Sequence, residues 1–146
     1  MFIFYLTFFI IVVPICIILH EVGHGIGCVV SSKTNVHIYL GPASQDNKQT
    51  FRIGKFHFHI IWSYVGFVNW EGQLNKRQSV IAFAGGPIMS LLLAILLGYL
   101  SFLDYELIFR KLFGWSAIVN GIQFVMTILP MTYPRWMGKY NILTSL

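Results

Sequence analysis

Apolar residues are concentrated in three long stretches of the chain, and shorter alternating patterns fill the connection between the first two. The long stretches cover about residues 2–30, 80–102 and 113–129. As a helix, each would be long enough to cross the roughly 30 Å hydrocarbon core of a bilayer. The pattern therefore predicts an α-helical integral membrane protein with a core of three transmembrane helices.

In the connection over residues 31–79, apolar and polar residues alternate instead of forming long apolar stretches. Its segments VHIYLG and TFRIGKFHFHIIW alternate apolar and polar residues as half-buried strands do, and the intervening GPASQDNKQ has the composition of a turn. We expect a small β-hairpin or sheet at the membrane face. The following SYVGFVNWEGQ combines aromatic residues with glycines, which suits the interfacial belt or a segment that dips into the bilayer.

The composition agrees with a membrane protein. Hydrophobic residues make up 56% of the 146 residues and charged residues only 10%, with a mean hydropathy of +0.70. A soluble domain carries about 25% charged residues. No repeat or linker divides the chain, so we expect one membrane-embedded domain over residues 1–146.

The basic residues predict an orientation. Two of the ten, Arg110 and Lys111, lie in the connection between the second and third stretches. The other eight lie in the long connection or in the C-terminal tail: Lys33, Lys48, Arg52, Lys55, Lys76, Arg77, Arg135 and Lys139. By the positive-inside rule, this places the long connection and the C-terminus in the cytoplasm and the N-terminus outside. The net charge of +5 is then explained by topology and contact with the lipid bilayer, and no basic, aromatic motif points to nucleic acid.

One motif within the first stretch carries chemistry. His20, Glu21 and His24 spell H-E-x-x-H, and on a helix the two histidines, four residues apart, share one face. Both imidazoles can then bind one Zn²⁺, with Glu21 beside a zinc-bound water whose pKa falls to about 7. Ionisable groups are costly in lipid, which favours a functional site. We therefore expect His20 and His24 to be metal ligands and Glu21 to be the catalytic base. Gly23 and Gly27 add a small-xxx-small face that a neighbouring helix or a substrate could approach closely.

Three segments in order resemble the site-2 protease family of intramembrane zinc metalloproteases. They are HEVGH, then FAGGPIMSLLLAIL at residues 83–96, and TILP at residues 127–130. The resemblance implies a hydrolase that uses Zn²⁺ and cleaves a transmembrane segment of a membrane protein. It also implies that the substrate unwinds near the metal and is held by β-augmentation, for which the strand at residues 51–61 is our candidate.

The sequence departs from the family pattern at three places. The family's third zinc ligand is an aspartate followed by glycine after the third core helix, but LPMTYPRWMGKYNILTSL contains no acidic residue. Ser90 and Thr127 stand where the family has asparagine.

His37, His57 and His59 could offer nitrogen ligands or could be interfacial histidines without a metal.

Three explanations of the missing aspartate stay open: a truncated chain, a pseudoprotease that keeps the scaffold, or an active variant with a substitute ligand. Two functions follow from them. One is an intramembrane zinc metalloprotease with Glu21 activating a zinc-bound water, and the other is a catalytically inactive or truncated pseudoprotease that binds membrane-protein segments. A small transporter or channel component would spread polar residues over several spans, whereas here the ionisable groups concentrate in one.

Overall fold

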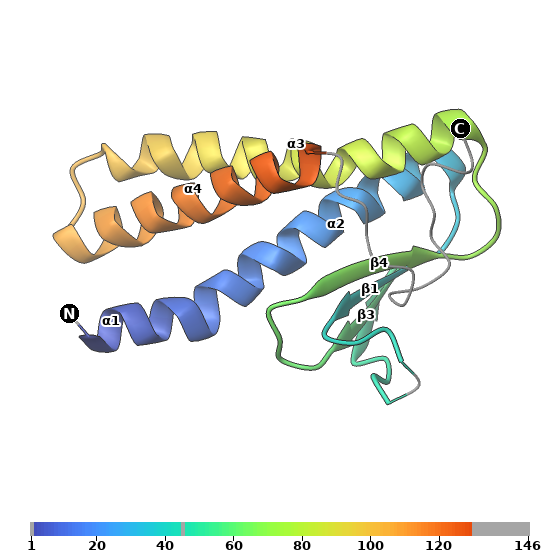
Figure 1. The fold of residues 1–146 in the computed structure, drawn as a ribbon, viewed down its shortest axis with the longest axis horizontal. Coiled ribbons are helices and arrows are strands. Elements are labelled where there is room, and N and C mark those ends of the chain that lie inside the picture. The colour runs from blue at the N-terminus through green and yellow to red at the C-terminus, as the bar shows by residue number, and fades with distance from the viewer. Residues whose placement is uncertain (1, 45, 130–146) are drawn as a thin grey trace.

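The computed structural model describes residues 2–44 and 46–129, which form three long helical segments and one sheet (Figure 1). The first helical segment is continuous and consists of α1 (Phe2–Thr7), the π-helix η1 (Phe8–Val12) and α2 (Val13–Ser32). The other two are α3 (Lys76–Ser101) and α4 (Leu107–Ile128). The three predicted apolar stretches are therefore helical. The expectations for the tail, residues 130–146, lie outside the described residues.

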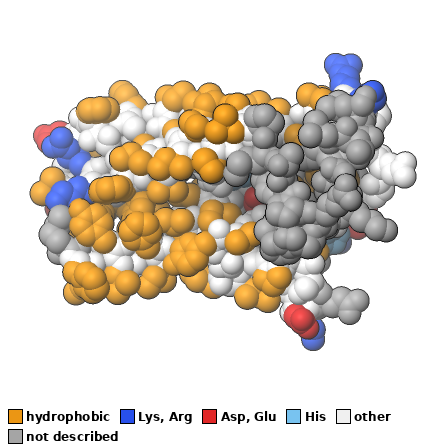
Figure 2. Space-filling model, in the orientation of Figure 1, with side chains coloured by type: hydrophobic (Ala, Val, Ile, Leu, Met, Phe, Trp, Pro, Cys, Tyr) orange, Lys and Arg blue, Asp and Glu red, His pale blue; other side chains and the backbone are white. Residues whose placement is uncertain are grey.

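Two of the described helical segments, Phe2–Ser32 and Lys76–Ser101, are long and apolar enough to cross a membrane by length and composition. α4 does not join them, because it contains the amides of Asn120 and Gln123 and the cations of Arg110 and Lys111. Figure 2 shows hydrophobic side chains spread over the helical part of the molecule, with charged side chains toward the two ends of its long axis.

The sheet lies between the first and second helical segments and is mixed. Its strand order is β2-β3-β1-β4. The strands are β1 (Val36–Leu40), β2 (Phe51–Ile53), β3 (Phe56–Ile60) and β4 (Gly66–Trp70). β2 and β3 form an antiparallel hairpin, β1 pairs in parallel with β3, and β4 pairs antiparallel with β1. Both alternating segments thus form strands, but the second, which was predicted as one strand over residues 51–61, is divided into the hairpin of β2 and β3. The aromatic segment after them adds a fourth strand that the sequence did not predict.

The two faces of the sheet differ, because successive side chains of a strand point to opposite sides. Val36, Ile38 and Leu40 of β1 are buried, and Val36 and Ile38 pack with Cys28 of α2 and Ala82 of α3. This apolar face lies along the C-terminal half of α2 (Figure 1). The alternate residues of β1 and β3 therefore point away from α2.

Glycines allow α2 and α3 to pack at close range. A Cβ atom on Gly23 would collide with the Gly85 carbonyl, and one on Gly27 would collide with the Ile81 carbonyl. The small-xxx-small face of α2 is thus occupied by α3. α3 begins just before this contact, with a capping box in which Asn75 and Gln78 exchange side chain to backbone hydrogen bonds.

Candidate metal centre

Consecutive turns of α2 bring the two predicted ligands together. The Nε2 atoms of His20 and His24 lie 3.2 Å apart. Two imidazole nitrogens bound at about 2.0–2.1 Å to one tetrahedral zinc ion would be separated by about 3.3 Å. The spacing of the two rings therefore fits a shared metal ion.

The Nδ1 atoms of both rings have partners on α3. His24 Nδ1 lies 2.9 Å from the Ala82 carbonyl oxygen, which can only accept, so Nδ1 carries the proton and Nε2 keeps its lone pair. The Gly86 amide is more distant from the same nitrogen, at 3.3 Å. His20 Nδ1 lies 2.7 Å from the Ser90 hydroxyl oxygen. Partners of this kind fix the tautomer and the orientation of imidazoles that bind metals.

The packing of α3 against the rings leaves them little freedom. His20 is only 2% exposed. A Cβ atom added to Gly86 would collide with the imidazole of His24, so this glycine makes room for the ring. The segment FAGGPIM thus supplies the wall of the site, and its Gly86 is required by the position of His24.

Glu21 lies on the side of α2 that faces the sheet. A Cβ atom on Gly66 of β4 would stand 2.7 Å from Glu21 Cγ and 3.0 Å from Glu21 Oε1. Within residues 2–44 and 46–129 the carboxylate has no hydrogen-bond or ion-pair partner. The carboxylate therefore lies at the edge of β4, next in the chain to His20.

The described residues do not supply a third ligand. They contain no group of three or more His, Cys, Asp or Glu side chains placed to hold one metal ion. His37, His57 and His59 lie on the face of the sheet that points away from α2, so they cannot complete the His20 and His24 pair. Two nitrogen ligands with ordered partners thus fit a zinc ion, and its remaining ligands are not among these residues.

Sequence reasoning missed the two partners on α3. Ser90 was interpreted only as a departure from the family pattern, yet its hydroxyl holds His20. Its position, where the family that the sequence resembles has asparagine, was the signal that could have identified it. The Ala82 carbonyl gives no signal in the sequence, because any residue could provide it.

A second polar group links α4 to α2. Asn120 is fully buried, and its amide nitrogen donates to Cys16 Sγ at 3.3 Å and to the Ser116 carbonyl at 2.8 Å. Cys16 lies one helical turn before His20. α4 therefore contacts α2 close to the metal centre.

Comparisons of the chain with models of protein families, with curated proteins and with solved structures give no match. The case for a function therefore rests on the residues and their geometry.

Proposed function

We propose that this chain is an intramembrane zinc metalloprotease that cleaves a transmembrane segment of a membrane protein. The observation that carries the proposal is the pair of Nε2 atoms of His20 and His24, 3.2 Å apart, with both Nδ1 atoms held from α3. Glu21 follows His20 directly, as the H-E-x-x-H motif requires.

Each residue of the motif has a separate task. His20 and His24 hold the zinc ion, and Ser90 and the Ala82 carbonyl orient their rings. When bound, zinc lowers the pKa of water and polarises the scissile carbonyl. Glu21 accepts the proton of the attacking water on its carboxylate and delivers it to the leaving amine nitrogen. Because His20 is buried, its ring is shielded from bulk water.

The substrate reaches the site as an extended chain along β4. The strand order leaves β2 and β4 at the two edges of the sheet, and β4 is the edge beside Glu21. An unfolded substrate segment can pair with the free backbone groups of such an edge. Our sequence-based candidate, residues 51–61, instead forms β2 at the opposite edge and β3 in the interior. We therefore assign substrate pairing to β4.

The proposed setting is the bilayer, with several passes of the chain. Large apolar side chains such as Leu92, Ile95 and Leu96 of α3 are 53–62% exposed, and so extensive an apolar surface is unusual for a protein in water. The positive-inside rule places the sheet on the cytoplasmic side and the N-terminus outside. Water and metal would then enter from the cytoplasm.

A second function uses the same edge of β4 without turnover. The described residues hold two nitrogen ligands and no third protein ligand, which favours a catalytically inactive pseudoprotease that binds membrane-protein segments. The two functions differ in what Glu21 does, because a binding protein needs no base.

The test compares cells that produce the native chain with cells that produce the Glu21→Gln variant. Mass spectrometry of newly formed peptide termini in the membrane fraction should find cleavages within transmembrane segments that the variant abolishes while its zinc content stays unchanged. Glu106→Gln makes the same chemical change at an exposed glutamate and should cleave normally. Identical cleavage in the native and Glu21→Gln samples would exclude the protease and leave the binding function.

A further inference from the structure

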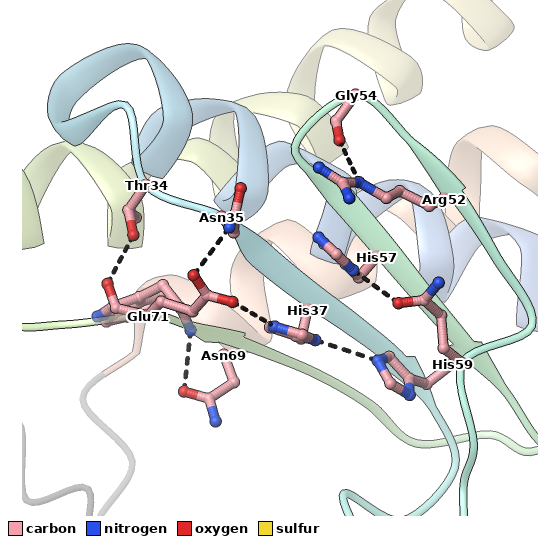
Figure 3. A network of polar contacts seen from close by, with 11 residues as sticks. Thr34, Asn35, His37, Arg52, Gly54, His57, His59, Asn69 and Glu71 are labelled. Carbon is pink, nitrogen blue, oxygen red and sulfur yellow. Dashed lines mark hydrogen bonds and ion pairs between the residues drawn. The ribbon is translucent and has the colours of Figure 1, made fainter.

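The outward face of the sheet carries a second pair of imidazoles in close contact. His37 of β1 and His57 of β3 are direct partners in the parallel register, and His59 lies two residues further along β3 on the same face. Nδ1 of His37 lies 3.1 Å from Nε2 of His59 (Figure 3). This separation is close to the 3.2 Å between the facing nitrogens of the pair on α2.

The far nitrogen of each ring determines where its proton is. Nδ1 of His59 lies 2.9 Å from the Asn47 carbonyl oxygen, which can only accept, so the proton of neutral His59 is on Nδ1. Nε2 of His37 lies 3.3 Å from Oε1 of Glu71. The Glu71 carboxylate also accepts a hydrogen bond from Nδ2 of Asn35 at 2.8 Å, so it acts as an acceptor toward both neighbours. The proton of neutral His37 is therefore on Nε2.

The unprotonated nitrogens Nδ1 of His37 and Nε2 of His59 thus face each other at 3.1 Å. Their lone pairs repel each other unless a cation lies between them. The arrangement of carboxylate, histidine and open nitrogen is one that proteins use to bind metals. Imidazole nitrogens select ions such as Zn²⁺, Cu²⁺ and Ni²⁺ over Mg²⁺ or Ca²⁺. The geometry is therefore that of two metal ligands with their outer partners already in place.

Space for further ligands adjoins the pair. A hollow of about 490 Å³ beside His59 is lined by Tyr39, Ser44, Asn47 and Lys48, among others. The buried Oδ1 atom of Asn47 has no hydrogen-bond partner within the described part of the chain. The hollow adjoins the pair on the side of His59, and water molecules can occupy the positions that two histidine ligands leave open on a tetrahedral ion.

We propose that the outward face of the sheet binds a second divalent transition-metal ion between Nδ1 of His37 and Nε2 of His59, with Glu71 and the Asn47 carbonyl as outer partners. The site is separate from the centre on α2, because it lies on the face of the sheet that points away from that helix. Metal binding at this site requires no catalytic activity, so the proposal can be tested independently of the proposed protease function.

The test measures zinc in the full-length chain, purified in detergent and dialysed against buffered Zn²⁺. In a His20→Ala/His24→Ala background, from which the centre on α2 has been removed, about one zinc per chain should remain. Adding His59→Ala should remove it. His57→Asn is the control: the ring of His57 stacks on that of His37 with centroids 4.7 Å apart, but its Nδ1 contacts Gln49 and its Nε2 has no hydrogen-bond partner among the described residues, so the zinc should stay. A background chain without zinc, or one whose zinc survives His59→Ala, would overturn the proposal.

A second experiment uses a milder variant, because the chain with both His20 and His24 replaced can fail to fold. Glu71→Gln on the otherwise native chain should weaken the second zinc by about 10- to 100-fold in competition with a chromogenic chelator, since it weakens an outer partner. Circular dichroism should show the native helix content. One zinc per native chain that is lost in His24→Ala, with no second zinc, would retain the centre on α2 and refute the site on the sheet.

Discussion

The backbone of Gly86 in α3 lies against the imidazole of His24 in α2, so that a Cβ atom at position 86 would occupy the space of the ring. The Ala82 carbonyl, one turn earlier on α3, holds the Nδ1 atom of the same ring at 2.9 Å. Both the position and the tautomer of His24 are therefore set by α3.

Gly86→Ala should remove zinc from the centre on α2. The added methyl group must displace the His24 ring or separate the two helices, and overpacking of this kind costs about 1–3 kcal/mol. Atomic spectroscopy of the purified chain measures the zinc. Gly98→Ala is a control on the same helix, because its Cβ atom would meet only the Ala117 side chain at 3.9 Å. Normal zinc content in Gly86→Ala would contradict the assigned role of Gly86.

Ser90→Ala should reduce zinc affinity at this centre by about 10- to 100-fold, because His20 loses the hydroxyl that orients its Nδ1. A chelator titration measures the change. Ser101→Ala removes a hydroxyl of the same helix that is bonded to the Gly98 carbonyl, and it should leave zinc affinity unchanged. Equal affinities in the two variants would show that Ser90 is only a packing residue.

Gly66→Ala should slow cleavage by about 10²-fold and leave the zinc in place. The new methyl group would press on Cγ of Glu21 and on Ile17, and a displacement of about 1 Å is enough for an effect of this size. The readout is the rate of formation of the cleaved termini that Glu21→Gln abolishes. In the control variant, Gly121→Ala, the methyl group has open space around it. Loss of zinc in Gly66→Ala would mean that β4 supports the histidines instead of the base.

Asn120→Leu should leave stability within about 1 kcal/mol of the native chain, whereas Asn120→Ala should lower it by about 1–3 kcal/mol. Oδ1 of the buried Asn120 has no partner within the described residues, so an apolar side chain of similar size removes an unpaired group while filling the same space. Unfolding in mixed micelles measures both variants. A leucine variant as unstable as the alanine variant would show that the bond to Cys16 matters more than the unpaired oxygen.

Local features were the ones that the sequence predicted well. The first apolar stretch was expected at residues 2–30, and the helical segment covers Phe2–Ser32. The facing of His20 and His24 follows from helical geometry alone, because residues four apart share a face. The alternation in VHIYL likewise predicted a strand, and this segment forms β1.

Features that join distant parts of the chain were missed. The partners of His24 and His20 on α3 lie 58 and 70 residues away in sequence, and one of them is a backbone carbonyl. The parallel pairing of β1 with β3 depends on a long connection that no local pattern specifies. β4 was interpreted as an interfacial segment because its glycine and aromatic residues have the composition of a membrane boundary.

The distance along the chain between the histidines and the groups that hold them sets an order of assembly. During synthesis, α2 is complete long before Ala82 and Ser90 exist, and the strand beside Glu21 also follows later. Until α3 has inserted, the two rings can rotate freely and have no fixed tautomer. At the proposed zinc site, metal capture would therefore be a late event in biogenesis, and a nascent chain that stalls before α3 would carry the H-E-x-x-H motif without the groups that hold its rings.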